Sequence, residues 1–182
     1  MEKILRELVD RHAIHDVVIR YCRAVDRMDR ALLLICYHPD AIDDHGLFVG
    51  PPPAFADWAF GLHSAIQTAH QHIVNNHSCE LDGDTAHCET YWMFAGMHRD
   101  GGGLTIGGGR YIDRMEKRDG QWRIAARKCV PDWGGQPQAG WLSPGAAAAL
   151  AGSGHCSRDR EDVSYERPLT IDPARIGKVF AL

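Results

Sequence analysis

The chain has 182 residues, of which 45% are apolar and 24% charged, and its formal net charge is -4 at pH 7. This length predicts one ordinary domain with a hydrophobic core of its own, and the slightly acidic balance argues against nucleic acid or an anionic membrane as partners. No apolar run reaches the ~18 to 20 residues of a membrane span, and the first residues lack the apolar stretch and cleavage site of a signal peptide. We therefore expect a cytoplasmic protein.

Three helices are expected in the first third of the chain. The longest covers residues 4–28, where apolar side chains recur at three- and four-residue spacings. A short second helix covers residues 30–37 and stops before Pro39, because the residue preceding a proline leaves the helical region. Residues 41–50 are expected to form a short strand or loop, which the prolines at 51–53 end. A third helix follows at residues 54–67.

From residue 70 the hydrophobic period changes from helical to two. Turn signals centred on Gly83-Asp84, Gly101-Gly102 and Asp119-Gly120 divide the sequence into strands at 71–81, 86–99, 104–117 and 121–130. This pattern predicts a four-stranded antiparallel meander. The Gly-, Ala- and Pro-rich stretch and the polar tail that follow are expected to be mostly irregular. Helices followed by a meander indicate an α+β fold.

Two-residue turns at these three points predict which side chains share a face of the sheet. They place Cys79 opposite Cys88, His72 opposite Ala95, and Ile112 opposite both Tyr91 and Arg127. One face is then expected to carry His72, Asn76, Tyr91, Met93, Met97 and Arg127, and the other Trp92, Phe94, Tyr111, Trp122 and Ile124. One face should line a core or pocket with the helices, and the other should meet another subunit. A single β-bulge would shift the assignment by one residue.

No metal site or cofactor is expected from the motifs. The six cysteines form no C-x-x-C pair. His70 and His72 form an H-x-H, but no carboxylate follows within four residues and no H-E-x-x-H is present. The glycine-rich segment 101–110 lacks G-K-[ST] and opens no helix, so it indicates a turn and small residues where strands bend. The facing Cys79 and Cys88 are expected to remain thiols in the cytoplasm.

His72 is the candidate general base. A histidine in a partly apolar pocket, paired with a carboxylate, is the usual base near neutral pH. Asp26, at the end of the first helix beside the apolar Val25 and Met28, is the candidate carboxylate. Taken alone, each residue is more often structural: a polar strand histidine, or a solvated acid at a helix end.

Four segments together resemble the SnoaL-like branch of the nuclear transport factor 2-like superfamily: "AIHDVVIRYCRAVDRMD", "YHPDAIDDHG", "HIVNNHSCELDGDTAHCETY" and "GGRYIDRMEKRDGQWRIAARKCVPDW". The resemblance covers about residues 5–135. It implies an α+β barrel in which a curved antiparallel sheet, closed by the N-terminal helices, surrounds a cone-shaped cavity. It also implies a cavity domain at residues 1–135 and a C-terminal extension at 136–182 that packs on the sheet or on a neighbouring subunit.

The resemblance also implies site residues. Lyases of this family, such as bile acid 7α-dehydratase, scytalone dehydratase and hexachlorocyclohexane dehydrochlorinase, use a His-Asp dyad with a tyrosine or lysine on the first helix and a late arginine. Carried over, the dyad is His72 and Asp26, with Tyr21 as proton donor to the leaving hydroxyl and Arg127 as stabiliser of the developing oxyanion. The expected substrate-binding residues are Phe48, Phe55, Trp58, Asn76, Tyr91, Met93 and Met97.

The function expected from this set is a cofactor-independent lyase. It would be a dehydratase that eliminates water from a hydrophobic, ring-containing, steroid-like substrate by general-base catalysis. The alternatives are a non-catalytic small subunit of a ring-hydroxylating dioxygenase, a ligand-binding protein, or an isomerase, cyclase or dehydrohalogenase. A homo-oligomer is expected because the aromatic sheet face is too apolar to leave in water. The resemblance favours a trimer over a dimer.

Overall fold

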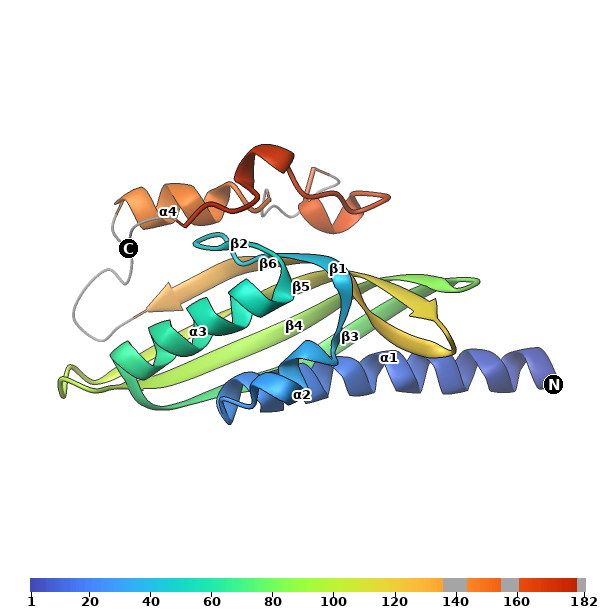
Figure 1. The fold of residues 1–182 in the computed structure, drawn as a ribbon, viewed down its shortest axis with the longest axis horizontal. Helices are drawn as coiled ribbons and strands as arrows, with labels where there is room; N and C mark the ends of the chain where they lie inside the picture. The colour runs from blue at the N-terminus through green and yellow to red at the C-terminus, as the bar shows by residue number, and fades with distance from the viewer. Residues whose placement is uncertain (136–143, 155–160, 180–182) are drawn as a thin grey trace.

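The computed structural model describes residues 1–135, 144–154 and 161–179 (Figure 1). The helices are α1 (Glu2–Asp26), α2 (Arg30–Leu34), α3 (Pro52–Ile66) and α4 (Pro144–Ala151). The strands are β1 (Tyr37–Asp44), β2 (Val49–Gly50), β3 (Gln67–Asp82), β4 (Thr85–His98), β5 (Leu104–Arg118) and β6 (Gln121–Gly135). The predicted α+β class is confirmed. Within the described ranges, no helix has the length and apolarity needed to cross a membrane.

The six strands form one curved, open sheet in the order β2-β1-β6-β5-β4-β3. Strands β3 to β6 are the predicted antiparallel meander. Strands β1 and β2 extend it, and β1 runs parallel to β6. The second helix ends earlier than predicted, at Leu34, because β1 already begins at Tyr37. Pro39 lies inside β1, where the pairing with β6 is interrupted between Tyr37 and Ile42.

Two of the three turns have the predicted register. Cys79 faces Cys88 across Gly83-Asp84, and Lys117 faces Trp122 across Asp119-Gly120, where both turn residues have positive φ angles as a type I′ turn requires. The turn predicted at Gly101-Gly102 is wrong. A longer loop connects β4 to β5, so Tyr91 faces Arg110 instead of Ile112. This shift of two residues leaves the faces of both strands unchanged.

Two β-bulges reverse the predicted face of two site residues. In β3, both Asn75 and Asn76 lie opposite the single residue Tyr91, so His72 faces Phe94 instead of Ala95. In β6, a second bulge at Ala125 makes Arg127 the partner of Asp113. Because a one-residue shift moves every following side chain to the other face, His72 and Arg127 join the aromatic face. They do share a face as predicted, but with a different set of neighbours.

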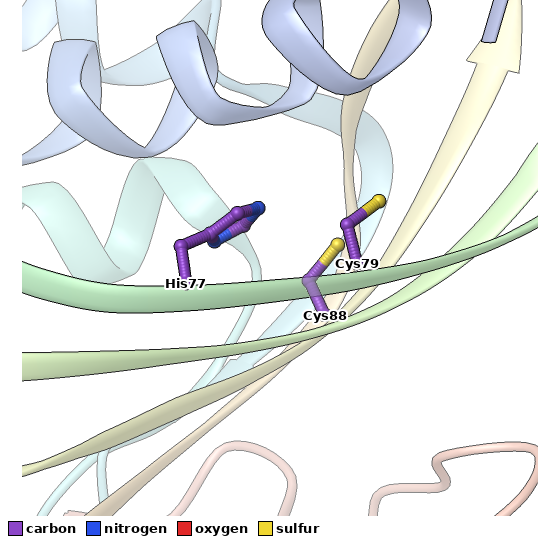
Figure 2. A group of neighbouring side chains, drawn as sticks. All are labelled: His77, Cys79 and Cys88. Atoms are coloured by element: carbon purple, nitrogen blue, oxygen red, sulfur yellow. The ribbon is translucent and has the colours of Figure 1, made fainter. Parts of the chain in front are cut away.

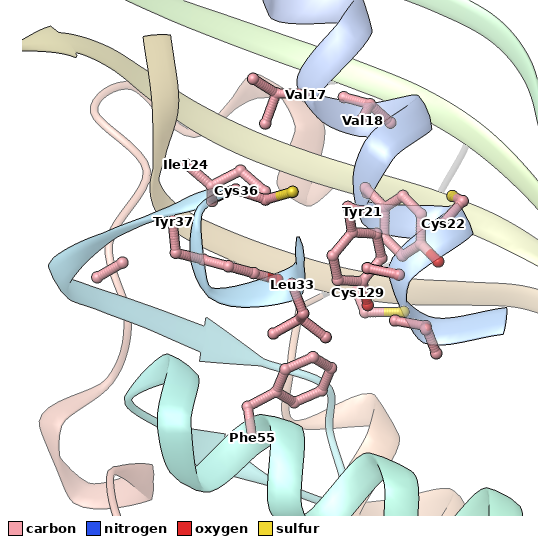
Figure 3. Packing of buried hydrophobic residues seen from close by; sticks show 14 of the residues in the cluster. Val17, Val18, Tyr21, Cys22, Leu33, Cys36, Tyr37, Phe55, Ile124 and Cys129 are labelled. Carbon is pink, nitrogen blue, oxygen red and sulfur yellow. The ribbon is translucent and has the colours of Figure 1, made fainter. Parts of the chain in front are cut away.

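The aromatic face is therefore the inner face, and the prediction that it meets another subunit is wrong. Helices α1, α2 and α3 cover it, and its residues form the main hydrophobic core (Figure 3). From α1 the stripe of Val17, Val18, Tyr21 and Cys22 packs inwards, as the spacing of apolar residues predicts. Phe55 from α3 completes the contact from the other side of the core.

Three consecutive glycines in β5 make room for two large rings. A Cβ atom at Gly109 would lie 2.1 Å from the carbonyl oxygen of Val130 and 2.7 Å from the ring of Trp92. A Cβ atom at Gly108, on the outer face, would lie 2.5 Å from the ring of Trp133. The glycine run thus serves packing of the sheet, as the sequence indicates.

An ion pair lies at the centre of the inner face. Arg127 is 0% exposed, and its Nε and Nη2 atoms each donate a hydrogen bond of 2.7 Å to the carboxylate of Asp113. The guanidinium packs over the rings of both Tyr21 and Tyr111, 4.1 Å from each centroid. Since Tyr21 belongs to α1 and the other three residues to the sheet, this cluster fixes the helix to the sheet.

The segment 161–179 lies across the sheet from α1 (Figure 1), and α4 packs on Leu47 and on Trp58 of α3. Val163 and Leu169 pack on Ile112 and Val130. The buried Asp44 accepts a hydrogen bond of 2.8 Å from Ser153 and pairs with Arg175. A buried ion pair and a hydrogen bond therefore join the C-terminal segment to β1, in addition to its apolar contacts.

Replacing Asp113 by Asn should destabilise the protein by about 3–5 kcal/mol, because it leaves the Arg127 charge buried and uncompensated. The midpoint of urea unfolding measures this loss. Asp40→Asn is the matched control, since Asp40 pairs with Arg118 in solvent, and an exposed pair is worth about 0–1 kcal/mol. Equal stability of both variants would contradict the role given to the buried pair.

The outer face still offers an apolar surface for self-association. Its exposed large residues include Ile73, Tyr91, Met93, Leu104, Ile106 and Trp133. We propose that copies of the chain meet there as a homo-oligomer, with the trimer preferred. Light scattering at micromolar concentration should give about three times the 20.2 kDa of one chain, and Met93→Asp with Ile106→Asp should lower this mass. A wild-type mass of one chain would contradict the proposal.

Candidate functional site

A cavity of about 270 Å³ lies between the inner face of the sheet and helices α1 and α3. Its wall is largely apolar and aromatic, with contributions from Phe55, Trp58, Trp92, Phe94 and Tyr111. Leu150 of α4 also lines it, so the C-terminal segment takes part in the enclosure. A mostly apolar cavity with a few converging polar groups is the usual form of a small-molecule site. Its polar lining includes four histidines: His45, His63, His72 and His98.

His72 and Asp26 form the predicted dyad. The Nδ1 atom of His72 lies 2.7 Å from Oδ1 of Asp26, and the backbone N–H of His72 lies 3.0 Å from both carboxylate oxygens. Both side chains are about 10% exposed or less. The Asp26 carboxylate accepts a hydrogen bond from Nδ1–H of His72, and in this tautomer Nε2 carries the lone pair. His72 lines the cavity while Asp26 lies behind it, so the geometry is that of a base held by a second residue.

His70 and His63 lie beside the dyad. The Nε2 atom of His70 is 3.2 Å from the carbonyl oxygen of Val25, so this nitrogen carries a proton and donates it. His63 stacks on His70 at 4.1 Å between ring centroids. Burial, followed by the neighbouring His72 and His70, lowers the pKa of His63 to about 3. His63 is therefore a neutral ring at physiological pH.

The group Asp26, His70 and His72 also has metal-ligand chemistry, since one ligand atom of each lies within 4.8 Å of the others. Its hydrogen bonds argue against that use. The carboxylate accepts three hydrogen bonds from His72, and the Nε2 lone pair of His70 is replaced by a proton directed at a carbonyl oxygen. A metal here would have to displace this whole network. The arrangement favours proton transfer instead.

A second histidine–aspartate pair, which the sequence analysis did not identify, contributes to the same cavity. Nδ1 of His45 donates a hydrogen bond to Asp43, which is fully buried, and Nε2 of His45 lies 3.2 Å from the hydroxyl of Tyr21. Tyr37 donates a 2.5 Å hydrogen bond to the other oxygen of Asp43. His45 and Tyr21 both line the cavity.

The second pair holds its histidine in the charged form. Burial alone would lower the pKa of His45, but the charge of Asp43, the neighbouring Cys129 and the hydrogen bonds to both outweigh it and raise the pKa to about 10. An imidazolium donates from both nitrogens, so Tyr21 accepts from Nε2 and its own O–H proton is free to point elsewhere. Burial, followed by the charge of Asp43, raises the pKa of Tyr21 well above its ordinary value, so the phenol stays protonated.

The structure brings some predicted site residues into the cavity and leaves others out. His72, Tyr21, Phe55 and Trp58 line it. The other predicted residues are not among the lining residues, which corrects their expected contact with substrate: Phe48, Asn76, Tyr91, Met93, Met97 and Arg127. Phe48 stacks behind Trp58 at 5.5 Å between ring centroids. Tyr91, Met93 and Met97 lie on the exposed outer face, and the bulge in β3 turns His72 to the opposite, inner face.

The largest difference from the expected site concerns Arg127, which was predicted to stabilise a developing oxyanion. Its charge is neutralised by Asp113 and covered by two tyrosine rings, so it does not reach the cavity as a stabiliser of an oxyanion. Within the described part of the chain its Nη1 atom has no hydrogen-bond partner. Its contact with the ring of Tyr21 makes it a residue that positions the phenol.

Comparison with known proteins identifies the family. A model of the SnoaL-like domain matches residues 6–128. A search of curated proteins finds no match. Among solved structures, hexachlorocyclohexane dehydrochlorinase LinA-type3 from Novosphingobium barchaimii is similar, with a TM-score of 0.68 and 19% identity over 77% of this chain and 99% of that chain.

Two structures from Novosphingobium aromaticivorans are also similar. A provisionally assigned scytalone dehydratase has a TM-score of 0.66 and 18% identity over 73% of this chain and 91% of that chain. A provisionally assigned aromatic ring hydroxylase has a TM-score of 0.62 and 26% identity over 69% of this chain and 91% of that chain.

At these sequence identities, the structural similarity shows a shared fold. The family itself is shown by the family model, which covers more than half of the chain. It matches the region that carries α1, the dyad and most of the sheet. The family includes dehydratases and dehydrochlorinases as well as isomerases. The chain belongs to the SnoaL-like branch of the nuclear transport factor 2-like superfamily.

Proposed function

We propose that the protein is a cofactor-independent lyase that eliminates water from a hydrophobic, ring-containing alcohol. The observation that carries this proposal is the pair of histidines lining one cavity in opposite settings. His72 presents a lone pair to the cavity, and His45 is held as a cation next to Tyr21. Two titratable groups whose surroundings give them different protonation states indicate an acid and a base.

In the proposed reaction, Nε2 of His72 removes a proton from a carbon next to an electron-withdrawing group. The electrons of the C–H bond form the new double bond, and the C–O bond breaks. Tyr21 gives its hydroxyl proton to the departing oxygen and is reprotonated by Nε2–H of His45. Water leaves, and solvent restores the proton to His45 and removes it from His72. Asp26 and Asp43 hold the two imidazoles in the tautomer and charge state that this sequence needs.

The cavity sets the size of the substrate. An engineered cavity of about 150 Å³ binds benzene, and the present cavity of about 270 Å³ is less than twice as large. We therefore propose a substrate with one or two rings. A four-ring steroid, which the resemblance suggested, would require the cavity to open. The flat walls of Trp58, Trp92 and Phe94 suit an aromatic or alicyclic ring.

The other function classes fit these observations less well. A non-catalytic small subunit of a ring-hydroxylating dioxygenase or a plain binding protein has no need of two buried, hydrogen-bonded histidine–aspartate pairs, which cost desolvation energy. An isomerase, cyclase or dehydrohalogenase would use the same base. Incubation with a panel of one- and two-ring hydroxylated compounds, followed by mass spectrometry for loss of water, distinguishes these activities by the mass change.

His72→Ala and Asp26→Asn should each lower turnover by about 10²- to 10⁴-fold, because the first removes the base and the second its orienting carboxylate. Steady-state kinetics on the substrate found in the panel measures the loss. Arg23→Gln is the control, since Arg23 belongs to the same helix but does not line the cavity. Full activity of His72→Ala would reject the mechanism.

The pH dependence of turnover should follow the protonation state of His45. Turnover needs its protonated form, so activity should fall as pH rises through about 10, the raised pKa of His45. Asp43→Asn removes the charge that holds the proton, and burial then lowers the pKa, so the alkaline limb should move to a more acidic pH.

Tyr37→Phe is the control for this profile. It removes one hydrogen bond to Asp43 but keeps the carboxylate, and its alkaline limb should stay near that of the wild type. Circular dichroism at each pH separates this effect from unfolding. An alkaline limb that does not move in Asp43→Asn would contradict the role of His45 as acid.

A further inference from the structure

A second cluster of reactive side chains lies beneath α1 and outside the lining of the cavity. His77 and Cys79 are two residues apart on β3, and Cys88 lies directly opposite Cys79 on β4. Residues two apart on a strand share a face, so all three project towards the helix-covered side (Figure 2). One ligand atom from each lies within 4.8 Å of the other two.

The imidazole of His77 is oriented by a hydrogen bond at one ring nitrogen only. Its Nδ1 atom is 2.7 Å from the hydroxyl oxygen of Thr90 on β4. Within the described ranges, its buried Nε2 atom has no hydrogen-bond partner. A buried polar nitrogen without a partner is unfavourable and calls for an explanation. When Nδ1–H donates to Thr90, Nε2 keeps a lone pair, which is how an outer hydrogen bond prepares a histidine to ligate a metal.

The two cysteines provide thiolates. Both are free thiols in the structure; Cys88 is fully buried and Cys79 half-buried. A bound cation would displace the thiol protons, because the thiolate is the form of cysteine that ligates metal ions.

We propose that His77, Cys79 and Cys88 form a binding site for Zn²⁺. Two thiolates balance the charge of a divalent ion, and the mixed sulfur and nitrogen set suits zinc and disfavours Mg²⁺ or Ca²⁺, which take oxygen ligands. Zinc–sulfur bonds of ~2.3 Å and zinc–nitrogen bonds of ~2.0 Å imply tetrahedral edges of roughly 3.5–3.8 Å. Because the ligand atoms already lie within 4.8 Å of one another, closing the cluster needs a contraction of at most about 1.3 Å, which side-chain rotation supplies.

Residues of α1 lie against the cluster. The ring of His15 contacts His77 edge-on at 5.2 Å between centroids. Arg11 donates a hydrogen bond to the carbonyl of Cys79. A bound ion would therefore lie between α1 and the β3–β4 hairpin. This site is structural and independent of the proposed reaction in the cavity.

Cobalt substitution tests the proposal directly. The whole protein, freed of metal with a chelator and kept reduced, is titrated with Co²⁺. The wild type should bind one equivalent, with thiolate-to-cobalt charge-transfer absorption and the visible bands of tetrahedral Co²⁺, and Zn²⁺ should abolish both. The sulfur signal separates this site from the group Asp26, His70 and His72, which contains no sulfur. Wild-type protein with titratable free thiols but no charge-transfer band would overturn the proposal.

Variants and thermal unfolding extend the test. Cys88→Ser and His77→Ala should lose the cobalt bands or bind at least ~10-fold more weakly. Cys36→Ser should keep them, since Cys36 is a buried thiol that bonds the carbonyl of Leu32 instead. Zinc at ~100 times its Kd should raise the wild-type Tm by roughly 5 °C or more, but not that of Cys88→Ser. Equal signals in Cys88→Ser and Cys36→Ser would refute the site.

Discussion

Arg127 and Asp113 place two full charges in the interior between α1 and the sheet, and much of the architecture follows from the need to satisfy them. Desolvated charges are tolerated only when they are paired closely and hydrogen-bonded. The bidentate contact, together with the rings of Tyr21 and Tyr111, meets that need and leaves one surface of the guanidinium against α1. The helix is thereby held at a fixed depth. Because Tyr21 and Asp26 belong to the same helix, the ion pair indirectly sets the position of both on the cavity side.

The cavity combines apolar walls with two hydrogen-bonded histidine–aspartate pairs, His72 with Asp26 and His45 with Asp43. Asp26 lies at the end of α1, and Asp43 lies in β1, so the two networks are anchored in different elements. In a water-poor site, hydrogen bonds to ionised groups are stronger than in water, and they hold the side chains without reorganisation during the reaction. The proposed acid and base can therefore be tuned separately, because a change near one carboxylate does not touch the other.

The sequence predicts the larger features of this structure because they depend on local signals. Apolar periodicity locates α1 and α3, and the Gly83-Asp84 and Asp119-Gly120 turns place the strands on either side in register. The dyad itself follows from the resemblance. What the sequence does not predict depends on backbone irregularity and on distant pairing. The bulges at Asn75-Asn76 and Ala125 have no strong signature, yet they decide that His72 faces the cavity and that Arg127 faces Asp113.

His45 could have been suspected from its position two residues after Asp43, since side chains at that spacing can reach one another. Its contact with Tyr21, however, depends on the pairing of β1 with β6, which brings this segment next to α1. Likewise, a metal-ligand group drawn from two facing strands has no C-x-x-C spacing to reveal it. Long-range contacts of this kind are not encoded in any short window of the sequence.

The bulge in β3 divides the strand into two stretches whose side chains alternate out of phase with one another. The stretch on the hairpin side carries His77 and Cys79, and the stretch beyond Asn75 carries His70 and His72. Deletion of one residue at the bulge would leave the hairpin unchanged. It would turn the side chains of the other stretch to the opposite face, so that His70 and His72 would point to solvent. Because of this break, the face that one stretch presents to the helices does not fix the face that the other presents. A strand without such a break would have to change both ends together.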